Sequence, residues 1–141
     1  MQFEVYQRET EQIARQQTSL LDEASTLLNS GKTLTGLEQN GVLHALQVLI
    51  ENAIGKAKHL LKAAEVPVPI SAYDTFAELI KQGYIPEHQK NQWNAIIGLR
   101  NKIVHDYMNI NIETVLDLVR QNAYQPITHF LLNKDVISSR T

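Results

Sequence analysis

Helical periodicity is the feature of this chain that most constrains its fold. Six glycines and four prolines are spread over 141 residues, and between them apolar residues recur at spacings of three and four, with little strict alternation. Such spacing puts apolar side chains on one face of a helix, whereas alternation would indicate strands. The sequence therefore predicts an all-α fold.

Signals at the ends of the periodic segments divide the first half of the chain into three helices. We expect the first over residues 3–28, ending at the sequence NSGK. The second begins at Thr35, because a glutamate three residues later completes the spacing of a capping box, and it runs to the break VPVP. A short third helix over residues 71–82 begins with a serine cap and stops at Gly83.

Two further helices are predicted in the second half of the chain. Pro86 suits the first turn of a fourth helix, and a fifth begins after Asn111 and meets Pro126, which should kink or split it. Four long helices with short connections favour an antiparallel four-helix-type bundle, in which the extra short helix packs across one end. We expect a single domain over residues 1–132 and a flexible C-terminal tail over residues 133–141.

Composition excludes several classes of protein. Nothing in the sequence has the length and apolar character of a membrane span or a signal peptide, so we expect a cytoplasmic protein that does not contact a membrane. The chain has no cysteine, which excludes disulfides and thiolate chemistry. Its five histidines show no metal-ligand spacing, and we expect neither a metal nor a cofactor. With a net charge of −2, contact with a nucleic acid would need a local basic patch.

One such concentration of positive charge lies in the second predicted helix. The segment GKAKHLLK holds Lys56, Lys58 and Lys62 with no acidic residue among them. These lysines either contact RNA or form an ordinary solvated helix face. The residues alone leave both interpretations open.

The segment GLRNKIVHDYM in the fourth predicted helix holds the candidate chemistry. At about 100° per residue, Arg100 and Tyr107 fall on the core-facing side of that helix. The other residues on this side are Trp93, Ile96, Ile97, Ile103 and Val104. A guanidinium cannot lose its charge and is costly to bury unpaired. Arg100 therefore either pairs with an acid such as Glu51 or lines a polar pocket that binds an anion.

His105 falls on a different side of the same helix, together with Asn94, Gly98 and Asn101. Because Gly98 would let another backbone approach, we expect this helix to lie against a second copy of itself at a symmetric seam. A histidine that moves a proton and an arginine that holds a phosphate are the groups required to cleave RNA through its own 2′-hydroxyl. A structural hydrogen bond is the alternative role for His105.

This segment resembles the HEPN superfamily and, within it, the HepT-type toxins, which are marked by R-x4-H-x-Y. Arg100, His105 and Tyr107 fill the three positions, and the resemblance covers residues 40–132. It implies a helical bundle that dimerises through the motif helix, with the motifs of two protomers meeting in a cleft. It also implies a metal-independent endoribonuclease in which Arg100 and His105 are catalytic and Asn101 supports them.

The resemblance further implies a partner that silences the toxin. The cognate antitoxin of this family is a minimal nucleotidyltransferase that transfers AMP from ATP to the motif tyrosine, which makes Tyr107 the expected site of AMPylation. On a continuous helix Tyr107 would lie about 20° from Arg100, so the added phosphate would occupy the phosphate site of the substrate.

One departure from the family pattern lies in the second predicted helix. Many relatives have an acidic residue near the position of Gly55, which Lys56 follows in this chain. There are two alternatives to a toxin. A bare helical interaction module has no need of Arg100, His105 and Tyr107 together, so the intact motif argues against it. The motif does not exclude a non-catalytic HEPN subunit that binds a nucleotide or presents substrate to a nucleotidyltransferase.

Overall fold

The computed structural model describes residues 2–133, which form helices joined by turns and contain no strand. The six α-helices are α1 (Gln2–Asn29), α2 (Gly36–Ala63), α3 (Ala72–Lys81), α4 (Lys90–His105), α5 (Ile112–Arg120) and α6 (Gln125–Leu132). Two single turns of 3₁₀ helix, η1 (Glu87–Gln89) and η2 (Tyr107–Asn109), flank α4.

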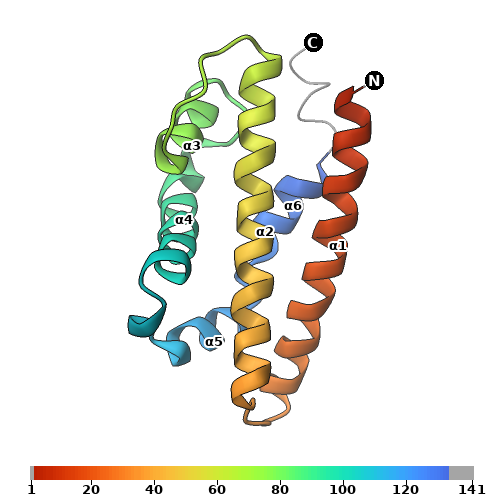
Figure 1. Ribbon diagram of the computed structural model, residues 1–141, viewed down its shortest axis with the longest axis vertical. Helices are drawn as coiled ribbons and strands as arrows, with labels where there is room; N and C mark the ends of the chain where they lie inside the picture. The colour runs from red at the N-terminus through yellow and green to blue at the C-terminus, as the bar shows by residue number, and fades with distance from the viewer. Residues whose placement is uncertain (1, 134–141) are drawn as a thin grey trace.

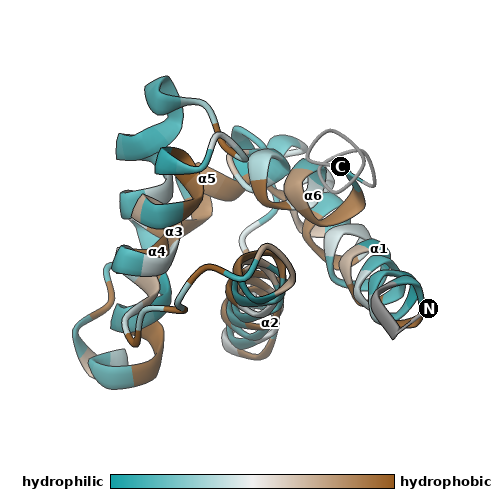
Figure 2. Ribbon diagram, turned by 90° about the horizontal axis from the view of Figure 1, so that it is seen from above, coloured by the Kyte–Doolittle hydropathy of each residue, from teal (hydrophilic) through white to brown (hydrophobic). Residues whose placement is uncertain are grey.

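The long helices α1 and α2 lie side by side and run in opposite directions (Figure 1). On the other side of α2 lies α4, with α3 packed against both. The fourth member of the bundle is broken into α5, which packs on α1, and α6, which packs on α1 and α2. Viewed from above, α2 lies between α4 and α1, and the apolar sides of α5 and α6 face it (Figure 2). The predicted all-α bundle with one extra short helix is confirmed.

Local capping interactions fix the helix ends where the sequence predicted them. The Thr35 hydroxyl accepts from the Glu38 N–H, and the Glu38 carboxylate accepts from the Thr35 N–H, which completes the capping box of α2. At the start of α3, the Ser71 hydroxyl accepts from the Asp74 N–H. Gly31 and Gly83, directly after α1 and α3, have φ angles of 90° and 86° that glycine adopts without strain.

Pro126 marks the break that the sequence predicted, whereas Pro86 does not lie in the first turn of α4 as predicted. Pro126 lies in the first turn of α6, where a missing N–H costs no helical hydrogen bond, and it follows the turn that separates α6 from α5. Pro86 precedes the single turn η1, and α4 itself begins at Lys90. Apart from Asn133, the predicted flexible tail lies outside the described residues.

An aromatic cluster in the core holds α4 in place. Trp93, in the first turn of α4, stacks on Phe76 of α3 with ring centroids 4.5 Å apart, and Phe130 of α6 contacts both rings. Ile97 and Ile103, further along α4, are also buried. Packing from three helices therefore sets the direction in which α4 leaves the core.

Glu65, just after α2, has a left-handed φ of 60° that a residue with a Cβ atom adopts at a steric cost. Replacing Glu65 with glycine should raise the free energy of unfolding by about 1 kcal/mol, measured by chemical denaturation. Glu65→Ala is the matched control, because it removes the same charge and keeps the Cβ atom. An equal effect of the two substitutions would show that backbone strain is not the cause.

Candidate active site

Arg100 lies near the end of α4 with its guanidinium held from two sides. Its Nη1 donates to Oδ1 of Asn101 at 2.9 Å, and its Nη2 lies 3.4 Å from Oε2 of Glu51 on α2. The side chain is 25% exposed, and its buried Nε has no hydrogen-bond partner among residues 2–133. The pairing with Glu51, one of the two alternatives left open by the sequence, is confirmed. Nε is buried, so contact with an anion would have to come from the remaining N–H groups of Nη1 and Nη2.

The structure accounts for the departure from the family pattern at Gly55. The acidic residue of α2 that pairs with Arg100 is Glu51, one turn before Gly55. Gln47 donates to the other carboxylate oxygen of Glu51, Oε1, at 3.4 Å. At Gly55 an ideal Cβ atom would lie 3.0 Å from the Tyr6 hydroxyl, so a larger side chain would displace Tyr6. Gly55 is therefore a packing position between α2 and α1, and the departure from the family pattern does not leave Arg100 without an acid.

The helix α4 ends at His105, whose side chain is exposed. Asp106 has φ −145° and ψ 41°, so the chain leaves the helical path there and enters η2. An exposed imidazole at the end of a helix is accessible to a substrate on the surface. Arg100 and His105 thus lie on the same last turns of α4, with the arginine partly buried and the histidine exposed.

Tyr107 is not where a continuous helix would put it. Because α4 ends before Tyr107, the expected position beside Arg100 is wrong, and the ring is 44% exposed in η2. Its hydroxyl donates to Oδ1 of Asn40 on α2 at 2.5 Å. Val104, also predicted to face the core, is 40% exposed. The other apolar residues of the predicted face are buried, namely Trp93, Ile96, Ile97 and Ile103.

The space beside Gly98 is filled from within the chain. An ideal Cβ atom at Gly98 would lie 3.2 Å from the hydroxyl of Tyr73 on α3. Part of the space at Gly98 is thus occupied by a side chain of the same chain, and the approach of a second copy there stays a prediction. Dimerisation through α4 stays a prediction that needs other support.

Lys56 is the largest correction to the predicted site. It is fully buried, and its Nζ donates to the carbonyl oxygens of Phe130, Leu131 and Asn133 at 2.8, 3.2 and 2.9 Å. Burial lowers the pKa of Lys56 to about 8, and the Glu11 carboxylate opposes this shift. Lys56 is thus an ammonium cap on the C-terminal end of α6 and cannot contact RNA.

The rest of the lysine segment lies partly at the surface. Lys58 is half-buried, Lys62 is exposed, and His59 stacks on Tyr6 of α1 with centroids 3.9 Å apart. A separation of two residues corresponds to a rotation of about 200° around the helix axis, so Lys56 and Lys58 lie on nearly opposite sides of α2. Contact of Lys58 and Lys62 with RNA stays a prediction.

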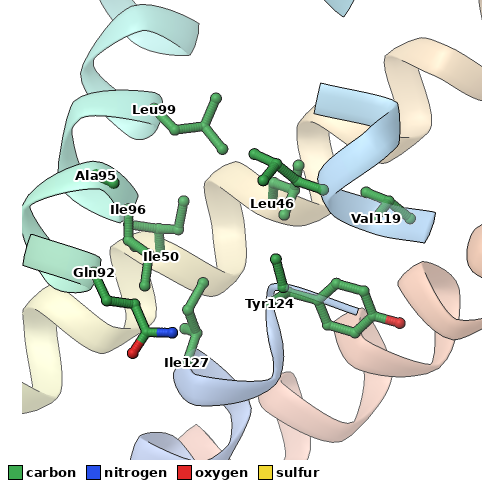
Figure 3. Close-up of a pocket in the computed structure, with 11 residues that line it drawn as sticks. Leu46, Ile50, Gln92, Ala95, Ile96, Leu99, Val119, Tyr124 and Ile127 are labelled. Atoms are coloured by element: carbon green, nitrogen blue, oxygen red, sulfur yellow. The ribbon is translucent and has the colours of Figure 1, made fainter. Parts of the chain in front are cut away.

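An apolar hollow of about 150 Å³ lies between α2, α4, α5 and α6 (Figure 3). Its walls are mostly aliphatic and include Leu46, Ile50, Ile96, Leu99, Val119 and Ile127. The Tyr124 ring forms part of the wall, but its hydroxyl points away and donates to Oδ1 of Asp22 at 2.5 Å (Figure 3). Burial and this hydrogen bond raise the pKa of Tyr124. The hollow thus offers no proton donor or acceptor for catalysis at neutral pH.

Residues 2–133 contain no group of three or more histidine, cysteine, aspartate or glutamate side chains placed to hold a metal ion. Within the same range, no helix has the length and apolar character needed to cross a bilayer. The held guanidinium of Arg100 and the exposed His105 make the last turns of α4, with Asn101, the candidate active site.

A family model described as ribonuclease HepT-like matches residues 14–133. The chain therefore belongs to the HepT-like ribonuclease family, within the HEPN superfamily, as the R-x4-H-x-Y pattern predicted. The mRNA nuclease HepT of Shewanella oneidensis is 30% identical over 84 residues, which span 60% of this chain and 63% of that protein. The alignment thus covers less than two thirds of that relative.

Solved structures share the fold. The tri-AMPylated HEPN toxin of Shewanella oneidensis, in complex with MNT antitoxin, matches with a TM-score of 0.77 at 21% identity, over 95% of this chain and 97% of the other. A crystal structure of a toxin–antitoxin with AMP-PNP matches with a TM-score of 0.76 at 21% identity, over 94% of this chain and 97% of the other. The helical arrangement is therefore that of HEPN toxins.

Proposed function

We propose that this chain is the toxin of a toxin–antitoxin pair, a metal-independent endoribonuclease that acts in the cytoplasm. The observation that carries this proposal is the state of Arg100. Asn101 and Glu51 hold its guanidinium through Nη1 and Nη2, the side chain is 25% exposed, and His105 follows at the exposed end of the same helix. A held cation that can bind a phosphate and an accessible imidazole are the two groups that RNA transesterification requires.

In the proposed reaction, His105 accepts the proton of a ribose 2′-hydroxyl. The 2′-oxygen then forms a bond to the adjacent phosphorus while the bond from that phosphorus to the 5′-oxygen breaks. The leaving 5′-oxygen takes up a proton, and a 2′,3′-cyclic phosphate is left on the other fragment. Arg100 donates hydrogen bonds to the phosphate oxygens and stabilises the charge that develops on them.

The proposal includes a homodimer that forms through α4. His105 lies at the exposed end of α4, whereas Arg100 is directed toward Glu51 on α2. One RNA strand must contact both the guanidinium of Arg100 and the imidazole of His105. A cleft between two copies of α4 would bring these groups together. Size-exclusion chromatography with light scattering checks this part independently of activity.

Silencing by AMP transfer to Tyr107 from a minimal nucleotidyltransferase antitoxin is the second part of the proposal. Tyr107 occupies the tyrosine position of the family motif, and its exposed turn is accessible to another protein. The structural relative from Shewanella oneidensis is tri-AMPylated and bound to its MNT antitoxin. The sequence relative from the same organism is an mRNA nuclease.

The proposal is tested with the purified chain, free of partner, on RNA in the presence of EDTA. We expect cleavage that leaves 2′,3′-cyclic phosphate ends, and we expect this cleavage to stop after incubation with the nucleotidyltransferase and ATP. Tyr107→Phe should still cleave and should resist silencing, because it has no hydroxyl to modify. Dependence on added metal, or products with 3′-hydroxyl ends, would contradict the mechanism. No cleavage by an unmodified chain whose Tyr107 still accepts AMP would favour the non-catalytic HEPN subunit.

A further inference from the structure

We propose that Asn40 is a positioning residue for the modification of Tyr107. The inference rests on the proposed function, because it concerns how the hydroxyl that accepts AMP is presented to the partner. Asn40 lies in the second turn of α2, 67 residues before Tyr107 in the chain, and the family motif does not include it.

The hydrogen bond between these two side chains ties an exposed turn to the body of the protein. The Tyr107 hydroxyl donates to Oδ1 of Asn40 at 2.5 Å. The other bonds around η2 are local, such as the Asp106 N–H to the Lys102 carbonyl and the Asn109 amide to the Asp106 carboxylate. Packing adds little, since the neighbouring Met108 is 90% exposed. Asn40 is therefore the group on α2 that sets the position of the phenolic oxygen.

This bond also sets which side of the phenolic oxygen is available for reaction. A tyrosine hydroxyl has one proton to donate and lone pairs with which to attack. Because the proton points at Asn40, the lone pairs point away from α2, and the 44% exposed ring leaves them accessible. The geometry therefore presents a nucleophile to a protein that approaches η2 with a bound nucleoside triphosphate.

Transfer of AMP to Tyr107 forms one bond to phosphorus and breaks another. The phenolic oxygen of Tyr107 forms a bond to the α-phosphorus of the nucleoside triphosphate, and the bond from that phosphorus to the bridging oxygen breaks. Pyrophosphate leaves, and the phenolic proton passes to solvent or to the leaving group. The neutral amide of Asn40 is not a base, so its contribution is the position of the oxygen before attack.

The test compares Asn40→Leu, which has a similar size and no acceptor, with Asn40→Asp, which retains an acceptor oxygen. Asn91→Leu, at an exposed asparagine in the first turn of α4, is the matched control. Each full-length variant is incubated with the nucleotidyltransferase and ATP at several toxin concentrations, and AMP incorporation is followed by intact mass. Thermal unfolding of each variant checks that the fold is retained.

We expect Asn40→Leu to lower kcat for AMP incorporation by about ten- to a hundred-fold with little change in KM. Asn40→Asp should retain most of the wild-type kcat, and Asn91→Leu should have the wild-type kcat. A merely structural role of Asn40 would change thermal unfolding and would not split kcat from KM in this way. A kcat of Asn40→Leu equal to that of the wild type would overturn the role of Asn40 and would leave the proposed silencing of the toxin intact. No AMP on Tyr107 of the wild type would overturn both the inference and the proposed silencing.

Discussion

Replacing His105 with alanine should lower the rate of RNA cleavage by about two to four orders of magnitude, because the reaction then lacks the group that moves the proton. Initial rates on a short single-stranded RNA measure the effect. The matched control is His88→Ala, at an exposed histidine in η1 at the opposite end of α4. Equal rates for the two variants would remove His105 from the mechanism.

Substitutions at Arg100 should also lower the rate of RNA cleavage, and here a second substitution separates the role of charge from that of geometry. Arg100→Ala should lower cleavage by about two to three orders of magnitude through lost stabilisation of the phosphate charge. Arg100→Lys should recover little of this loss, because an ammonium lacks the planar fork that donates to Asn101, Glu51 and a phosphate together. Full recovery by lysine would mean that a positive charge suffices and that the held geometry is unimportant.

Replacing Lys56 with methionine should lower the free energy of unfolding by about 3–5 kcal/mol. The substitution leaves three carbonyl oxygens at the end of α6 without their donor and leaves the buried Glu11 without the positive charge opposite it. Lys62→Met, at an exposed lysine on the same helix, is the control and should change stability by no more than about 0.5 kcal/mol. Similar denaturation midpoints for the two variants would show that the cap is not stabilising.

The Lys56 cap also predicts a dependence on pH. The folded-state pKa of about 8 lies below the unfolded value of about 10.4, so the unfolded chain binds more protons between these values. The stability of wild type should therefore rise relative to Lys56→Met as the pH increases from about 8 to about 10. Other titrating groups cancel in this difference, so parallel stability curves would contradict the shifted pKa.

Helix positions and the family motif could be predicted from the sequence, because their causes are local. The capping box at Thr35, the glycine stop at Gly83 and the break at Pro126 each depend on a few neighbouring residues. Arg100 was conspicuous for a related reason, since a charge on an apolar helix face needs a partner and Glu51 was a candidate within reach.

The errors arose where the deciding contact is distant in sequence. Lys56 lies in a run that reads as a solvated basic face, and its burial depends on carbonyl groups about 75 residues away that no local pattern reveals. The predicted position of Tyr107 was wrong because α4 ends at His105, where no glycine or proline marks the end. Asn40 was missed altogether, since its signal is a hydrogen bond across 67 residues.

The buried pair of Lys56 and Glu11 has a consequence for the proposed binding of RNA. One positive and one negative side chain are withdrawn from the surface together, so the charge that solvent sees keeps the net value of −2. The net charge therefore gives a polyanion no long-range attraction. Binding of the proposed RNA substrate would depend on local positive groups near α4, and the dependence of its affinity on salt would report how many phosphates those groups contact.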